Sequence, residues 1–275
     1  MAEVGGTQLW YERSGSGAPL LYCNGSGATL AAARPVIERL AGSFDVVGFD
    51  FRGMGDSPLT SSPYSMADVA ADVSGLLDHL GWDRCRLIGL SFGGMVAQEV
   101  AVTVPERVER LALLSTSPGG EFPSYPLEEL ADLPAHDRAT RSLLLADRRW
   151  TSEWLGQHPD DLQIVLTMAE GQPTDEDDDQ RAGRLAQLAA RRGHDVVDRL
   201  ARIDSPTFVG CGTFDDIAPV VNAEAIAQRV PGAELHVFEG GHLFLFQDER
   251  AWPELLEFLG ADEVRPPDEK TSAEE

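Results

Sequence analysis

The chain has 275 residues, 43% of them hydrophobic, and a formal net charge of −24. This length and apolar content allow one large domain or two small ones with a sizeable buried core. The acidic excess excludes nucleic acid and anionic membrane surfaces as expected partners, because phosphate binding needs clustered Lys and Arg side chains. We expect neither a membrane span nor a secretory leader, since no run approaches roughly 18 apolar residues and residues 1–10 lack a basic segment followed by an apolar one.

Apolar runs that predict buried strands alternate with segments of helical spacing. The expected strands are residues 20–23, 44–49, 86–90, 111–114, 207–211 and 235–238, with residues 7–12 as an outer antiparallel strand or hairpin. The expected helices are residues 31–40, 66–80, 95–104 and 220–229. This alternation predicts an α/β fold with a mostly parallel sheet and helices on both faces, the doubly wound arrangement.

Residues 117–203 interrupt the alternation. They show helical patterns divided by proline and glycine, and no convincing strand. We therefore expect a helical region there, inserted into a core of residues 1–116 and 204–261. The acidic run at 175–179 is expected to be an exposed loop, and the polar segment 262–275 to be a disordered acidic tail.

A glycine-flanked serine follows the strand expected at residues 86–90. The sequence reads Gly89-Leu90-Ser91-Phe92-Gly93 and continues directly into a helical pattern. A G-x-S-x-G turn between strand and helix holds its serine on a tight corner, with the hydroxyl exposed above the sheet. A Cβ at either glycine would crowd the neighbouring backbone. The pattern predicts that Ser91 is a nucleophile.

Two further side chains stand where the partners of a nucleophilic serine are expected. Such a serine needs a base, and the base needs a carboxylate that orients it. Asp215 and His242 each follow a predicted strand directly, at the sheet edge where parallel sheets carry their ligand-facing groups. The order serine, acid, histidine predicts a catalytic triad of Ser91, Asp215 and His242.

Five other histidines compete with His242 for the role of base, but none follows a strand end after the acid. His79 and His236 lie inside a predicted helix and a predicted strand, where histidine is usually structural. Three lie in the inserted region, where contact with a substrate stays open: His136, His158 and His194.

Cysteine and histidine spacing indicates no metal site, because neither H-x-x-x-H nor a paired-cysteine motif occurs. The three cysteines fall in or at the end of predicted strands: Cys23, Cys85 and Cys211. An odd count without a pairing pattern predicts buried, reduced thiols and a cytoplasmic protein.

Four motifs together resemble the α/β-hydrolase superfamily over nearly the whole chain. Besides the serine turn, residues 50–57 are similar to its D-x-R-G-x-G-x-S turn, residues 212–219 to its G-x-x-D-x-x-x-P acid loop, and residues 240–242 to its G-x-H turn. The resemblance implies an α/β-hydrolase fold in which residues 117–203 form a helical cap. A weaker resemblance is to the bacterial branch of enol-lactonase-like enzymes and methyl esterases.

The resemblance also implies roles for individual residues. The family's acid stands three residues after the glycine, which is Asp215, and we interpret Asp216 as a cap of the helix that begins near Pro219. The oxyanion hole would use the backbone N–H groups of Ser26 and Phe92. Asn24 precedes Gly25 where the family commonly carries histidine.

A cap over the nucleophile would exclude water and supply an apolar wall. The predicted pocket residues are Asn24, Trp150, Trp154, Met168 and Leu243. The cap residues among them could equally form the core of the cap itself.

Together these features predict a serine hydrolase that cleaves a carboxylic ester or lactone of a small, fairly apolar substrate through an acyl-enzyme, without a cofactor. Carbon–carbon bond hydrolases, perhydrolases and acyltransferases share these residues, although Leu243 stands where carbon–carbon hydrolases often carry Trp. Aspartate-nucleophile relatives are disfavoured by Ser91. A non-catalytic ligand receptor on a hydrolase scaffold is the alternative from another class.

Overall fold

The computed structural model describes residues 1–60, 63–130, 133, 135–170 and 177–261. Its strands are β1 (Ala2–Val4), β2 (Thr7–Leu9), β3 (Tyr11–Gly15), β4 (Pro19–Cys23), β5 (Asp45–Phe49), β6 (Cys85–Leu90), β7 (Val108–Leu114), β8 (Thr207–Gly212) and β9 (Glu234–Phe238). Its helices outside the β7–β8 connection are α1 (Leu30–Ala41), α2 (Met66–Leu80), α3 (Phe92–Thr103), the 3-10 turn η1 (Pro105–Arg107), α8 (Val220–Arg229), α9 (Phe244–Gln247) and α10 (Ala251–Gly260).

Seven strands form the central sheet, in the order β3-β5-β4-β6-β7-β8-β9. β3 pairs with β5 antiparallel, and the remaining pairs in this sheet are parallel. β1 and β2 form a separate antiparallel hairpin. The predicted outer strand at residues 7–12 is thus divided between β2 of the hairpin and the first residues of β3.

Both faces of the sheet are buried, and alternate residues of a strand enter different cores. In β6, Leu87 packs in the core lined by α2, α3 and α8, whereas Ile88 packs in the core lined by α1, α9 and α10. Leu21 and Tyr22 of β4 divide in the same way. Helices therefore cover both faces, and the predicted doubly wound arrangement is confirmed.

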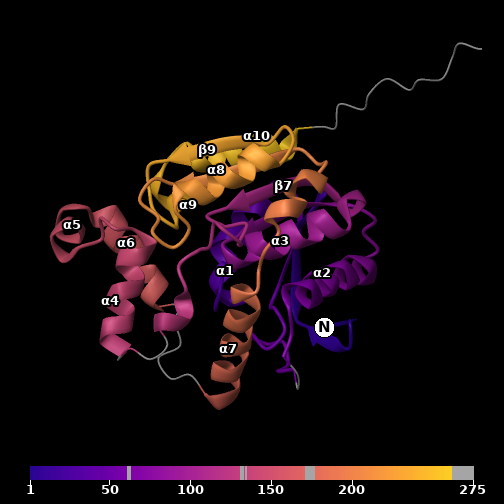
Figure 1. Ribbon diagram of the computed structural model, residues 1–275, viewed down its shortest axis with the longest axis horizontal. Coiled ribbons are helices and arrows are strands. Elements are labelled where there is room, and N and C mark those ends of the chain that lie inside the picture. The colour runs from indigo at the N-terminus through magenta and orange to yellow at the C-terminus, as the bar shows by residue number, and fades with distance from the viewer. Residues whose placement is uncertain (61–62, 131–132, 134, 171–176, 262–275) are drawn as a thin grey trace, which may run out of the picture.

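The connection between β7 and β8 is helical, as expected. It contains η2 (Leu127–Leu130), α4 (Ala135–Ala146), α5 (Ser152–Gln157), α6 (Pro159–Glu170), α7 (Asp178–Arg192) and η3 (Val197–Arg202). Figure 1 shows α4, α5 and α6 set to one side of the sheet and its flanking helices. None of the described helices combines the length and apolar character needed to cross a bilayer.

One expectation about local structure was wrong, and two helices were not predicted. Residues 177–179 belong to a helix start instead of a loop, because Asp177 accepts the Gln180 N–H at 2.8 Å and caps α7. The sequence analysis also missed α9 and α10, although Trp252, Leu255 and Leu259 are buried at helical spacing in α10. The remainder of the acidic run and the predicted tail at 262–275 lie outside the described residues.

Candidate active site

Ser91 occupies the corner between β6 and α3 with a positive φ of 55°, a backbone conformation that residues other than glycine seldom adopt. Its N–H donates to Leu114 O at 2.8 Å, and its carbonyl oxygen accepts from Thr116 Oγ1 at 2.7 Å and Gly94 N at 2.9 Å. These bonds to β7, to the loop after it and to α3 hold the strained corner in place.

The flanking glycines are required by close backbone approach. A Cβ on Gly89 would collide with the carbonyl oxygen of Gly93, and a Cβ on Gly93 would collide with that of Cys23 at the end of β4. The turn predicted from the G-x-S-x-G pattern is therefore formed by contacts that larger residues would prevent.

Asp215 and His242 meet at the carboxyl edge of the sheet. The carboxylate lies in the loop after β8, is 1% exposed, and accepts from His242 Nδ1 at 2.7 Å through Oδ2. Its other oxygen accepts the N–H groups of Ile217 at 2.8 Å and Ala218 at 2.9 Å. A ring that donates from Nδ1 keeps Nε2 free to accept a proton.

Ser91 Oγ has no hydrogen-bond partner in the described part of the chain, whereas the His242 ring is bonded to Asp215. Hydrogen bonds between nucleophile and base are often long without substrate and close in the substrate complex. The structure thus joins acid to histidine directly and leaves the serine hydroxyl available.

The expected capping role of Asp216 was wrong. The residue preceding α8 is Pro219, which makes no side-chain cap, and the nearby N–H groups of Ile217 and Ala218 are already bonded to Asp215. Asp216 instead forms an ion pair with Arg148 at 3.2 Å, in which both side chains are nearly half exposed.

The loop after β4 lies against Ser91, since a Cβ on Gly25 would be 3.7 Å from Ser91 Cβ. The backbone N–H groups of Ser26 and Phe92 donate to no group within the described ranges. Phe92 begins α3, and a first-turn N–H has no partner inside its own helix. Asn24 shapes this loop itself, because its amide bonds Thr29 O and Gly25 N, both at 2.9 Å.

Apolar side chains of the inserted helices pack against the loops that carry Asp215 and His242. Trp150 is 3% exposed and belongs to a cluster with Ile217 of the acid loop, and Trp154 and Leu243 pack against the same cluster. Three of the predicted pocket residues are therefore gathered beside Asp215 and His242. The side chain of Met168, in α6, lies outside the described residues.

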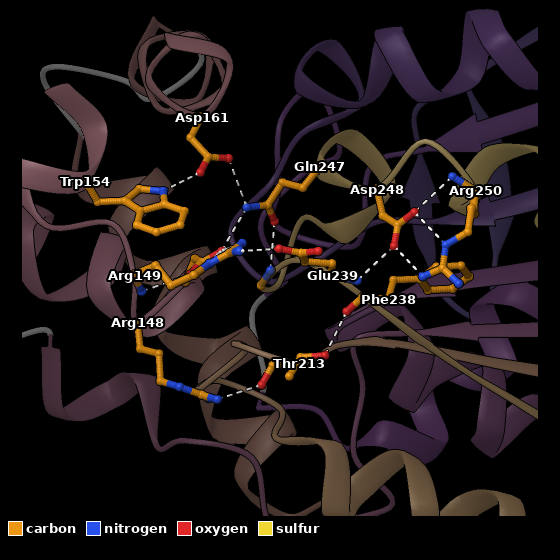
Figure 2. A network of polar contacts seen from close by, with 12 residues as sticks. Arg148, Arg149, Trp154, Asp161, Thr213, Phe238, Glu239, Gln247, Asp248 and Arg250 are labelled. Carbon is orange, nitrogen blue, oxygen red and sulfur yellow. Dashed lines mark hydrogen bonds and ion pairs between the residues drawn. The ribbon is translucent and has the colours of Figure 1, made fainter. Parts of the chain in front are cut away.

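A polar network ties the same region together (Figure 2). Gln247 Oε1 accepts the N–H of Gly241 at 2.8 Å, and Gln247 Nε2 donates to Asp147 at 2.8 Å and to Asp161 at 3.2 Å. Asp161 also accepts from the Trp154 indole N–H at 2.6 Å. One amide thus joins the residue before His242 to two carboxylates from the inserted helices.

The end of α4 and the turn after it, residues 145–149, are also bonded to the loops that carry Asp215 and His242, and we name this segment the α4–α5 corner. Ala146 O accepts the His242 N–H at 2.6 Å, and Leu145 O accepts the Asp216 N–H at 3.0 Å. The buried Asp147 is neutralised by Arg149, whose Nη2 donates at 2.7 Å. Movement of this corner would therefore displace the histidine and acid loops together.

Two cavities of about 550 Å³ and about 230 Å³ lie away from the triad. The larger is lined by Arg52, Leu59 and their neighbours, and the smaller by Asp50, Arg34 and theirs. None of the predicted site residues lines either of these two cavities.

Comparison with known proteins agrees with the architecture. The family model described as alpha/beta hydrolase fold matches residues 18–249. The chain belongs to the α/β-hydrolase family.

The relatives of this α/β hydrolase include ester and lactone hydrolases. It is 30% identical over 251 residues to a poly(3-hydroxyalkanoate) depolymerase of Ectopseudomonas oleovorans, covering 90% of this chain and 86% of the relative. It is 26% identical over 241 residues to 3-oxoadipate enol-lactonase 2 of Acinetobacter baylyi, covering 86% of each. The solved enol-lactonase of Burkholderia xenovorans superposes with a TM-score of 0.77 at 26% identity, covering 94% of this chain and 98% of the other.

Sequence reasoning missed the residues that connect the inserted helices of this α/β hydrolase to the loops carrying Ser91, Asp215 and His242. Gln247 comes five residues after His242, directly after a run of phenylalanine and leucine. It begins the polar run Gln247-Asp248-Glu249-Arg250, so the sequence gives no signal that sets it apart from the polar residues after it. Gln187 and Arg191 stand one helical turn apart, and their spacing is typical of a solvent-facing stripe. In the structure both are buried, with 0% and 5% exposure.

Proposed function

We propose that this α/β hydrolase cleaves carboxylic esters or lactones through an acyl-enzyme, with Ser91 as nucleophile, His242 as general base and Asp215 as the residue that orients His242. The observation that carries the proposal is the 2.7 Å bond between a fully buried carboxylate and His242 Nδ1. It directs the free Nε2 toward a proton-accepting role at the sheet edge that also carries the strained Ser91.

The reaction follows from these roles. Ser91 Oγ attacks the carbonyl carbon of the substrate while His242 Nε2 takes the hydroxyl proton. The N–H groups of Ser26 and Phe92 hold the negative oxygen that develops, and each such donor is worth about 3 to 4 kcal/mol of transition-state stabilisation. His242 returns the proton to the departing alcohol oxygen and then activates a water that releases the acid from Ser91.

The ester and lactone specificity is supported by the relatives. One is named for depolymerising a poly(3-hydroxyalkanoate) and another for opening an enol-lactone, so both names point to attack on a carboxylic ester bond. We assign residues 117–203 as a cap that supplies the apolar wall, with Trp150, Trp154 and Leu243 beside the two triad loops. A small, fairly apolar substrate fits such a wall.

A cytoplasmic setting is part of the proposal. It is supported by three buried free cysteines, Cys23, Cys85 and Cys211. Burial raises the pKa of Cys85 and of Cys211 to about 12, which keeps both thiols protonated and unreactive.

Labelling with a fluorophosphonate, together with hydrolysis of short p-nitrophenyl esters, tests the proposal. The protein should be modified at Ser91 and should release p-nitrophenol, and Ser91→Ala should lose both properties. Ser74→Ala is the matched control, because Ser74 lies on α2 and bonds only Ala70 O, at 3.1 Å. A folded wild-type protein that neither labels nor hydrolyses any ester would contradict the proposal and favour a ligand receptor.

A further inference from the structure

Helix α7 crosses the carboxyl edge of the sheet. A Cβ on Gly183 would collide with Gly53 O in the loop after β5, so the first half of α7 touches that loop. One turn later, Gln187 Oε1 accepts the N–H of Gly27, in the loop after β4, at 2.7 Å. Past the end of α7, the Val196 N–H donates to Pro118 O, in the loop after β7, at 3.0 Å.

These contacts with the loops after β5, β4 and β7 imply that the last turn of α7 passes near the end of β6, which Ser91 follows. The strand order across this region is β5-β4-β6-β7, and Ser91 directly follows β6. Along α7, Arg191 lies about 6 Å beyond Gln187 at helical rise, which is close to the spacing of about 4.8 Å between β4 and β6. Arg191, one turn after Gln187, therefore passes the end of β6.

The face of α7 that meets these loops is polar and buried. Gln187, Arg191 and His194 are 0%, 5% and 5% exposed. Among the described residues, Gln187 Nε2 and Arg191 Nε have no hydrogen-bond partner. Ser26 Oγ, beside Gly27, is buried and unpartnered as well. Unpartnered donors of Gln187 and Ser26 thus lie at the loop that contacts Ser91, and Arg191 follows one turn later on the same helix.

Arg191 brings a positive charge without a counter-charge. Its Nη2 donates to Ser124 Oγ at 2.7 Å, and no carboxylate lies within ion-pair distance in the described ranges. Burial lowers the pKa of Arg191 to about 10, partly opposed by the more distant Glu128, so the guanidinium stays protonated at neutral pH. A buried charge of this kind is energetically expensive unless a partner arrives.

We propose that Arg191 and Gln187 bind a carboxylate carried by the substrate, held beside the ester or lactone carbonyl at Ser91. The inference rests on the proposed function and adds to it that the preferred substrate is an anion. Arg191 presents a planar fork that suits the two oxygens of a carboxylate, and Gln187 Nε2 adds a neutral donor.

Charge balance favours a carboxylate over a phosphate. Arg191 contributes one positive charge and Gln187 none. Burial lowers the pKa of His194 to about 4, so its ring is neutral at pH 7. A carboxylate brings one negative charge, whereas a phosphate monoester brings nearly two and would leave an excess buried charge. Because the chain as a whole carries −24, an anionic substrate needs a local cation of this kind to be selected.

The test compares two esters of similar length. The anionic one is mono-p-nitrophenyl glutarate and the neutral one is p-nitrophenyl hexanoate. In the wild-type protein we expect kcat/KM for the glutarate to be about 10- to 100-fold higher, mostly through KM, as for hydrogen bonds to a charged group. Arg191→Met should reduce the ratio of kcat/KM for the glutarate ester to kcat/KM for the hexanoate ester by a similar factor.

The neighbouring Arg192→Met is the matched control, because Arg192 lies on the same turn of α7 but is exposed. It should keep the wild-type ratio. Arg191→Met should fold, since replacing an unpaired buried charge by an apolar side chain of similar volume is often stabilising. Independently of any variant, free glutarate should inhibit hexanoate hydrolysis by the wild-type protein, and neutral glutaramide should not.

The outcomes separate this inference from the proposed function. The carboxylate site alone is overturned if both esters are hydrolysed with nearly equal kcat/KM and Arg191→Met leaves that ratio unchanged. Equal inhibition by glutarate and glutaramide overturns it as well. Absence of hydrolysis of either ester, together with no labelling at Ser91, overturns the proposed function and the site with it.

Discussion

Gln247 accepts the backbone N–H of Gly241 at 2.8 Å and thereby fixes the residue immediately before His242. The same side chain donates to Asp147 and Asp161 from the inserted helices. The imidazole position is therefore coupled to the position of these helices through this amide, shown in Figure 2, in addition to the direct bond from the His242 N–H to Ala146 O.

Replacing Gln247 with alanine should lower kcat for ester hydrolysis about 10- to 100-fold with a smaller change in KM, because small misplacements of catalytic groups are that costly. Gln247→Glu should be more damaging, since it places a third carboxylate beside two others and removes their shared donor. Gln163→Ala on α6, exposed and bonded only to Thr167, is the control. Steady-state kinetics of all three variants would decide, and wild-type kcat in Gln247→Glu would refute the coupling.

The two neighbouring aspartates should respond differently to the same change. Asp215→Asn keeps the shape but removes the charge that orients His242, so kcat should fall about 10⁴-fold. Asp216→Asn loses only an ion pair that is about half exposed, worth at most about 1 kcal/mol, and should keep kcat within about twofold. Ester hydrolysis by both purified variants checks this. The reverse pattern would move the acid role to Asp216.

Gly241 should not tolerate a side chain. A Cβ there would collide with Ala146 O and would lie 2.6 Å from Asp147 Cβ, so the α4–α5 corner or the histidine loop must shift. We expect Gly241→Ala to lower the free energy of unfolding by about 1 to 3 kcal/mol and to reduce kcat. Urea denaturation and ester kinetics on the same samples measure both effects.

Gly156 provides the matched comparison. It lies in α5 with no atom within 4 Å of an added Cβ. Gly156→Ala should therefore stabilise the protein by about 0.5 to 1 kcal/mol through helix propensity, without loss of activity. If both variants behaved alike, close packing of the corner on the histidine loop would not be the cause.

The inner strands of the sheet could be predicted from the sequence because they are buried on both faces and read as continuous apolar runs. The edge strands β3 and β9 are largely exposed, so the expectation of a buried strand at residues 235–238 was wrong. The bounds expected for α2 and α8 coincide with the observed ones, since each buries one apolar stripe. The motifs around Ser91, Asp215 and His242 could be located because local backbone constraints restrict the residue types allowed at fixed positions. The collision that excludes a Cβ at Gly93 is one such constraint.

Contacts between segments distant in the chain could not be recognised from the sequence pattern. Asp147 stands in the charged run Asp147-Arg148-Arg149, which is typical of a solvated turn, yet it is 0% exposed because Arg149 and Gln247 satisfy it. Arg191 and Arg192 are adjacent and chemically identical, and only the rotation of α7 against the core buries one and exposes the other. Such differences depend on tertiary packing, which periodicity alone does not specify.

His194 should make stability depend on pH. Burial lowers its pKa to about 4 from 6.5, so between these values the unfolded chain binds a proton that the folded protein excludes. The stabilisation from the neutral ring is complete above about pH 6.5 and is lost as the pH falls to about 4, amounting to about 3 kcal/mol. Urea denaturation of the wild type and of His194→Leu across this range isolates the effect, because contributions common to both proteins cancel. The free energy difference should shift in favour of His194→Leu as the pH falls, and a difference that stays constant would show that the folded protein binds the proton as readily as the unfolded chain.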